Sequence, residues 1–179
     1  MKEDIAKKFE KIFTEESDTI FRFCLFRVSN KEQALDITQE SFLRLWQNFS
    51  QEKEEIHNYK AFLFTVARRL IIDWYRKKKS VSLESLMKNN EEKKFEYEYD
   101  LIDEKTKDNI EVGAEGRYLL EKIRKLTPVS QNPIYLRFIE DLSLQEIGNI
   151  LGISENAVSV RINRGLLKLR EEMGYINKR

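Results

Sequence analysis

Apolar residues recur at helical spacing over the first part of the chain. Between residues 15 and 48 the spacing predicts two helices with a break at residues 29–30. A third run, residues 62–75, follows i, i+3, i+4, i+7 steps and leaves a face that is mostly arginine. This run predicts an amphipathic helix with a basic outer face. The cations of residues 77–79 close the helix and complement the negative end of its dipole.

Helical spacing returns at residue 118 and predicts a helix that stops at Thr127-Pro128, followed by a second helix. The second helix is expected to bury a stripe made of Ile134, Leu136, Phe138 and Ile139. Residues 81–115, between the two helical parts, have no sustained apolar period and hold eleven acidic against five basic residues. We interpret them as an acidic linker that is mostly flexible.

The most specific pattern lies between residues 142 and 170. Ser143 can cap a short helix, Gly152 can supply the left-handed residue that ends it, and Ser154 can cap a second helix. The buried side of the second helix is expected to be Val158, Ile162, Leu166, Leu169 and Met173. Two such helices joined by a glycine turn are typical of a helix-turn-helix, which presents its second helix to the DNA major groove.

The alternative for this segment is a helical hairpin inside a bundle. The outer face of the second helix argues against it, because its side chains are of types that read bases or bind phosphates rather than a solvated glutamate and lysine mixture. These side chains are Asn156, Ser159, Asn163 and Arg164.

Together the patterns predict an all-α protein with two small helical domains, residues 1–80 and 116–179, joined by the linker 81–115. The composition agrees, because 6 glycines and 2 prolines among 179 residues are too few for the many tight turns of an all-β sandwich or barrel.

The net charge of +1 conceals strongly signed segments. Residues 60–80 carry a net +6, residues 81–115 a net −6, and residues 161–179 a net +4. Two basic segments separated by an acidic one suggest two faces that bind a polyanion, joined by a segment that does not. The alternative for a single basic run is an ordinary solvated helix surface.

Several classes of function are disfavoured. One cysteine, Cys24, and one histidine, His57, can form neither an internal disulfide nor a four-ligand metal cluster, so we expect an intracellular protein without metal or cofactor. The chain has no glycine-rich phosphate loop and no catalytic arrangement that one histidine could serve, so we expect no enzyme activity. No window approaches the roughly 18 apolar residues of a membrane span, and the start of the chain has no apolar leader.

At this point the sequence resembles the bacterial RNA polymerase sigma factors of the sigma-70 family, in the small extracytoplasmic-function (ECF) group. DITQESFLRLWQNF is similar to the family's region 2 helix that binds the polymerase clamp. KAFLFTVARRLIIDWYRKKKS is similar to the helix that engages the minus-10 promoter element. LSLQEIGNILGISENAVSVRINRGLLKLR is similar to the region 4 helix-turn-helix that reads the minus-35 element.

The resemblance implies roles for individual residues. For the clamp-binding helix, it implies contacts with a coiled coil of the largest polymerase subunit by Asp36, Gln39 and Glu40. Helix capping or a plain i,i+4 surface array is the alternative for these three. For the recognition helix, it implies contacts with the minus-35 element by Ala157, Ser159, Val160, Asn163 and Arg164. We add Asn156, which lies on the same outer face, and Arg161, which we expect to be exposed and to contact phosphate.

For the minus-10 element, the resemblance implies DNA contacts by Arg68, Arg69, Arg76 and Lys77, and capture of an unstacked base by the turn His57, Asn58, Tyr59 and Lys60. A captured base needs a stacking surface and hydrogen-bonding groups, which this turn contains. Trp74 and Tyr75 continue the apolar stripe of their helix, so we expect them in the core.

The function that follows is a sigma subunit in the cytoplasm that binds core RNA polymerase and promoter DNA and directs transcription initiation. The resemblance also implies an inhibitory partner, an anti-sigma factor. The competing interpretation is a helix-turn-helix transcriptional regulator that acts without polymerase.

Overall fold

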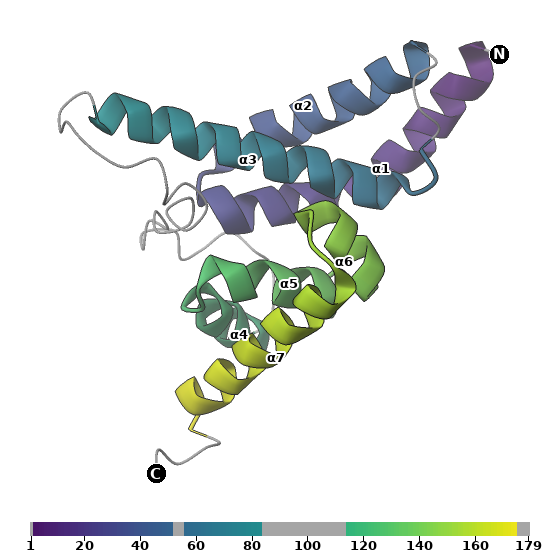
Figure 1. Cartoon of the computed structure of the whole chain (residues 1–179). Coiled ribbons are helices and arrows are strands. Elements are labelled where there is room, and N and C mark those ends of the chain that lie inside the picture. Colours follow the sequence, from purple (N-terminus) through teal and green to yellow (C-terminus); the bar gives the residue numbers. More distant parts are fainter. Residues whose placement is uncertain (1, 52–55, 84–113, 175–179) are drawn as a thin grey trace. The chain divides into compact units, whose positions relative to one another are not determined.

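A computed structural model describes residues 2–51, 56–83 and 114–174 of the chain, which form seven helices and no strand. The chain divides into two compact units, residues 1–109 and 110–179 (Figure 1). The expectation of an all-helical protein with two domains is confirmed. The boundaries expected at 80 and 116 stay a prediction, because most of the segment expected to be a linker lies outside the described residues.

The first unit packs three helices against one another in pairs: α1 (Lys2–Val28), α2 (Lys31–Ser50) and α3 (Tyr59–Leu83). Neighbours along the chain run in opposite directions (Figure 1). Phe23 of α1 and Phe64 of α3 meet edge to face in the core, with ring centroids 5.0 Å apart. Other side chains that are fully buried there are Ile20, Leu25, Leu45 and Leu63.

The predicted break between the first two helices is confirmed. Ser29 has a φ of 56°, and Asn30 caps α2 by accepting a hydrogen bond of 2.9 Å from the Gln33 amide. The first helix begins earlier than expected: α1 starts at Lys2, whereas the sequence pattern places its start near residue 15. Its early turns pack on α2 through Phe9 and Phe13.

The second unit contains α4 (Ala114–Arg124), α5 (Pro128–Phe138), α6 (Leu144–Leu151) and α7 (Glu155–Glu172). The expected stripe on α5 is half right: Ile134 and Leu136 are buried, whereas Phe138 is 59% exposed and Ile139 41%. Phe138 is the last residue of the helix and Ile139 its C-cap, and the end of a helix leaves such side chains open to solvent.

The residues expected to be buried in α7 also divide. Val158, Ile162 and Leu169 are buried, whereas Leu166 and Met173 are half-buried. Gly165 takes a buried position instead, facing α5. Among the helices that the structure describes, none is long and apolar enough to cross a membrane.

Candidate functional site

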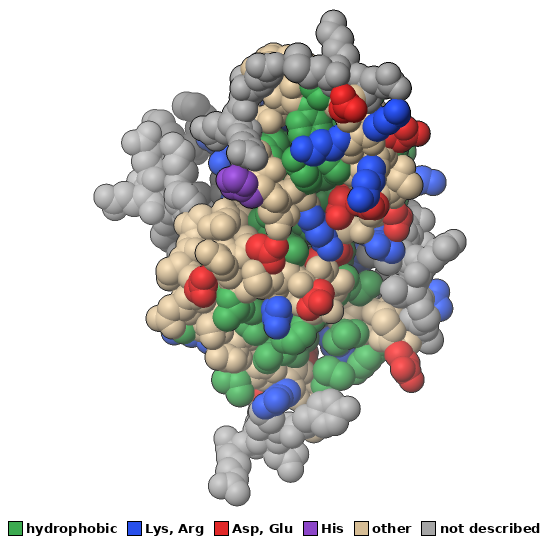
Figure 2. All heavy atoms as spheres, turned by 90° about the vertical axis from the view of Figure 1, so that its right-hand side faces the viewer, with side chains coloured by type: hydrophobic (Ala, Val, Ile, Leu, Met, Phe, Trp, Pro, Cys, Tyr) green, Lys and Arg blue, Asp and Glu red, His purple; other side chains and the backbone are tan. Residues whose placement is uncertain are grey.

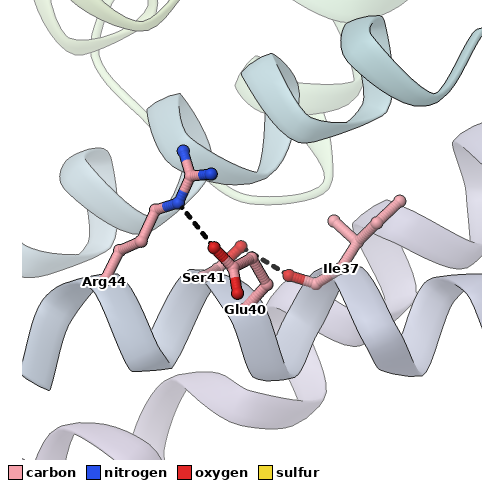
Figure 3. Close-up of polar contacts among 4 residues, drawn as sticks. All are labelled: Ile37, Glu40, Ser41 and Arg44. Atoms are coloured by element: carbon pink, nitrogen blue, oxygen red, sulfur yellow. Dashed lines mark hydrogen bonds and ion pairs between the residues drawn. The ribbon is translucent and has the colours of Figure 1, made fainter. Parts of the chain in front are cut away.

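Two acidic residues of α2, Asp36 and Glu40, line a cleft that α2 shares with α3. Asp36 is exposed and Glu40 is half-buried, where its Oε1 accepts a hydrogen bond of 2.9 Å from Arg44 Nε (Figure 3). Ser41 turns inward and donates to the Ile37 carbonyl at 2.7 Å, so its hydroxyl is satisfied within the helix. Glu40 therefore belongs to an i,i+4 ion pair, while the Asp36 carboxylate is open to solvent.

This cleft has a volume of about 580 Å³. Its charged lining is mixed, since Arg44, Asp73, Arg76 and Lys77 line it together with Asp36 and Glu40. The structure therefore brings together two residues expected to contact polymerase and two expected to contact DNA. The remaining lining residues are Gln33, Ile37, Leu70 and Trp74.

Gln39 lies outside this cleft, on a second exposed face of α2. That face is apolar: Leu35 is 41% exposed, Leu43 48% and Trp46 38%. With Gln39, these side chains are spaced 4, 4 and 3 residues apart, which places them on one side of the helix. Sequence reasoning missed this face, because helical periodicity groups the exposed Leu35 and Trp46 with the buried Ile37 and Phe42.

The turn that precedes α3 is built into the helix start. His57 is exposed at the surface (Figure 2), and Asn58 Oδ1 accepts a hydrogen bond of 2.8 Å from the Ala61 amide, which caps the first turn. Tyr59 is half-buried, and its ring meets Phe49 edge to face with centroids 5.6 Å apart. Lys60 is half-buried near Glu16. Burial raises the pKa of the Glu16 carboxyl, against a smaller opposite effect of the positive charge on Lys60.

The outer face of α3 is basic as expected. Arg69, Arg76 and Lys77 are exposed and Arg68 is half-buried, while Asp73 forms a 3.5 Å ion pair with Arg76. This face can therefore hold several phosphates.

The two aromatic residues expected in the core of α3 differ. Tyr75 is buried, and its hydroxyl donates a 2.5 Å hydrogen bond to the Arg27 carbonyl. Trp74 is half-buried: it lines the cleft, and the Lys78 ammonium lies 5.2 Å from its ring centroid. The expectation is confirmed for Tyr75 and is wrong for Trp74.

The helix-turn-helix forms through the caps expected from the sequence. Ser143 and Glu146 make a capping box: the Ser143 amide donates to Glu146 Oε2 at 2.8 Å, and the Glu146 amide donates to Ser143 Oγ at 3.2 Å. Gly152 has a φ of 68°, and Ser154 Oγ accepts a bond of 3.2 Å from the Ala157 amide at the start of α7. These local bonds fix where α7 begins and how it leaves the turn.

The residues expected to face DNA divide by exposure. The exposed ones follow i, i+4, i+7, i+8 spacing along one side of α7: Asn156, Val160, Asn163 and Arg164. The half-buried ones flank that side: Ala157, Ser159 and Arg161. The expectation that Arg161 is exposed is therefore wrong: of these seven positions, Arg161 lies furthest around the helix from the centre of the exposed side.

In the part of the chain that the structure describes, we find neither a candidate metal site nor a reactive thiol. No cluster of three or more His, Cys, Asp or Glu side chains occurs there. Cys24 is buried, and burial raises the pKa of its thiol to about 12, against a smaller opposite effect of a hydrogen bond with Thr38. A thiol with this pKa stays protonated near neutral pH and is a poor nucleophile.

Comparison with known families matches both units. Residues 12–81 match sigma-70 region 2, and residues 123–171 match sigma-70 region 4. The first range contains the exposed faces of α2 and α3, and the second contains the helix-turn-helix.

Among curated proteins, the chain is 32% identical over 158 residues to the ECF RNA polymerase sigma factor SigW of Bacillus subtilis, covering 87% of this chain and 83% of SigW. It is 27% identical to SigX of the same organism, covering 97% of this chain and 88% of SigX. It is also 27% identical to the ECF sigma factor BldN of Streptomyces coelicolor, where the match covers 86% of this chain but only 55% of BldN.

Two solved structures have a similar fold. One is the sigma factor RpoE from Bartonella quintana, solved with the anti-sigma factor NepR, with a TM-score of 0.69, 16% identity and coverage of 96% of this chain and 99% of that one. The other is CnrH, solved with the cytosolic domain of CnrY, with a TM-score of 0.64, 19% identity and coverage of 95% and 90%.

Proposed function

This chain belongs to the ECF group of the sigma-70 family of RNA polymerase sigma factors, whose members direct transcription initiation, and we propose that it does so through three surfaces on its two units. The observation that carries the proposal is the order of the two family matches, region 2 over residues 12–81 and region 4 over residues 123–171. A regulator acting without polymerase would need only the second. The family is not enzymatic, in agreement with the sequence-based expectation.

The first surface is α2, which binds core RNA polymerase through Asp36, Gln39 and Glu40. Carboxylates and an amide suit an arginine-rich coiled coil, and the exposure of Asp36 and Gln39 supports this role. The apolar face of α2 adds Leu35, Leu43 and Trp46, because solvent-exposed apolar side chains around a polar centre are typical of an interaction site.

The second surface binds the minus-10 element. The exposed cations of α3, Arg69, Arg76 and Lys77, hold phosphates, with Arg68 beside them. The preceding turn, His57 to Lys60, captures an unstacked base of the non-template strand. Tyr59 supplies the stacking surface, and its fixed position against Phe49 supports that role.

The third surface is the exposed side of α7, which enters the major groove at the minus-35 element. Asn163 and Arg164 can make hydrogen bonds to base edges, and Val160 can contact a thymine methyl group. Asn156, Ala157 and Ser159 lie at or near the N-terminal end of the helix, where amide dipoles favour phosphate. Arg161, on the flank, contacts phosphate.

We further propose that an anti-sigma factor holds the chain inactive in the cytoplasm. Two proteins of the same fold were solved with partners, one of them described as an anti-sigma factor. A free chain with exposed polymerase-binding and DNA-binding surfaces would otherwise compete for core enzyme at all times.

Run-off transcription with purified core polymerase tests the proposal. The chain should join core enzyme and initiate from at least one genomic fragment. The double charge swap of Asp36→Lys and Glu40→Lys should abolish core binding, while the matched swap of Glu171→Lys and Glu172→Lys, at exposed positions of α7, should leave it unchanged. Binding to an operator and regulation without core enzyme would instead support the polymerase-independent regulator.

A further inference from the structure

The start of α1 reaches the turn that precedes α3. The Lys8 ammonium lies 4.9 Å from the centroid of the Tyr59 ring and 5.5 Å from that of Phe49. The two rings meet edge to face with centroids 5.6 Å apart. Three helices therefore contribute to one small cluster, in which a cation from α1 covers the aromatic residues of α2 and α3.

Packing nearby keeps Lys8 in this place. Its neighbour Phe9 meets Trp46 edge to face at 5.1 Å between centroids, and Phe13, one turn later, meets Phe42 at 4.9 Å. These contacts hold the early turns of α1 against the last turns of α2. Lys8 itself is exposed, so its stem is free to reorient while the helix stays fixed.

A second contact joins α1 to the same turn. Glu16 is half-buried, and its charge interacts with Lys60 at the start of α3. Lys60 follows Tyr59 directly in the chain. Two residues of α1 therefore approach this turn, Lys8 at Tyr59 and Glu16 at Lys60, and they lie about two helical turns apart along α1.

We propose that Lys8 is a nucleic-acid contact of the minus-10 site, and that its ammonium moves from the Tyr59 ring to the phosphate of the captured nucleotide when the promoter opens. This inference rests on the proposed capture of a base at Tyr59. A base that stacks on the ring face covered by the ammonium displaces the ammonium from that face. A nucleotide brings that base together with a phosphate, and an ammonium binds a phosphate more strongly than it binds an exposed ring.

Lys8 then has two roles. Before promoter binding it shields the Tyr59 ring and holds its orientation, and afterwards it neutralises one phosphate of the single strand. The ligand is a single-stranded nucleotide with its phosphate, and a duplex does not qualify because its bases cannot reach the tyrosine.

Holoenzymes containing Lys8→Met, Lys8→Arg or Lys11→Met test the proposal. The probe is a non-template oligonucleotide that carries the single-stranded minus-10 region of a promoter this holoenzyme uses, with affinity measured over a range of salt concentrations. Lys8→Met should weaken binding several-fold and make the salt slope shallower by about 0.7, the value for one phosphate of a single strand. Lys8→Arg should keep both the affinity and the salt slope of the unmodified protein.

Lys11→Met is the matched control, because it removes the same charge one turn further along α1, where Lys11 lies 3.9 Å from Glu15. Holoenzyme containing Lys11→Met should bind the single-stranded oligonucleotide with the affinity of the unmodified protein. A duplex containing only the minus-35 region should bind equally to all variants. Equal effects of Lys8→Met and Lys11→Met, or no effect of Lys8→Met, would overturn the proposal.

Tyr59→Ala separates this inference from the function on which it rests. If Tyr59→Ala lowers affinity for the single strand and Lys8→Met does not, base capture stands and the role of Lys8 is wrong. If Tyr59→Ala has no effect, base capture at Tyr59 is wrong, and the proposal for Lys8 fails with it.

Discussion

Gly165 of α7 lies directly against the Ile134 side chain of α5. A β-carbon on Gly165 would collide with Ile134 Cδ1 and lie 2.9 Å from the β-carbon of Ser130. The absence of a side chain at this position therefore lets the DNA-recognition helix lie close to α5, and the fold of the second unit depends on it.

Gly165→Ala should destabilise the second unit by about 1 to 3 kcal/mol, because an added methyl group overpacks the contact with α5. Hydrogen exchange of amides in residues 123–171 should become faster. Tryptophan fluorescence during urea unfolding should not change, since both tryptophans, Trp46 and Trp74, lie in the first unit. Lys168→Ala, at an exposed position of the same helix, is the control. Unchanged exchange in Gly165→Ala would contradict the close packing.

Tyr75→Phe should lower the free energy of unfolding of the first unit by about 1 kcal/mol. The substitution removes the hydrogen bond to the Arg27 carbonyl, which joins the end of α1 to α3. Tryptophan fluorescence in urea measures it, because Trp74 is the adjacent residue. The matched variant Thr14→Val, which removes an exposed hydroxyl group of α1 in the same unit, should leave the transition unchanged. A loss as large in the control would show that the effect is not due to this bond.

The Cys24 thiol should make the first unit less stable at high pH. Its pKa in the folded protein is about 12, against an ordinary value of 9.0, so the folded state keeps the proton that the unfolded state loses. Stability should fall by about 1.4 kcal/mol per pH unit between pH 9 and 12 relative to Cys24→Ala. Urea unfolding of both proteins across this range measures the difference. If the stability of the two proteins changed with pH in the same way, burial would not raise the pKa of the Cys24 thiol.

Leu43→Glu should weaken core polymerase binding about ten-fold or more, because it places a charge in the apolar face of α2. Folding should be unaffected, since Leu43 is 48% exposed. Leu119→Glu, at a similarly exposed position of α4, should bind core enzyme normally. The effect of Leu43→Glu should persist at high salt, whereas that of the Asp36 and Glu40 charge swap should diminish. Normal binding by Leu43→Glu would remove the apolar face from the interface.

Arg164→Ala should reduce holoenzyme affinity for a minus-35 duplex by about 1 to 3 kcal/mol and relax the preference at one base position. Arg161→Ala should weaken all sequences alike, because its half-buried position on the flank suits a phosphate contact. Competition between duplexes with single base changes distinguishes the two. Identical profiles for both variants would contradict the division of α7 by exposure.

Features that depend on neighbouring residues could be predicted from the sequence. The caps at Ser143 and Ser154 and the left-handed Gly152 form hydrogen bonds or turns within a few residues, so their positions follow from local chemistry. The order of the helices, the break between α1 and α2 and the basic outer face of α3 follow for the same reason. The three family segments were recognisable because each is a continuous stretch of chain.

Features that depend on which helices meet were decided by the tertiary structure. Periodicity identifies an apolar side of a helix but not how much of it a neighbour covers, so the exposure of Leu43 and Phe138 could not be predicted. The contact of Lys8 with Tyr59 joins residues fifty-one positions apart, and the cleft that places Asp36 near Lys77 depends on the packing of α2 on α3. The sequence by itself determined the helices and the family; the packing of side chains distant in sequence decided which surfaces are left to bind.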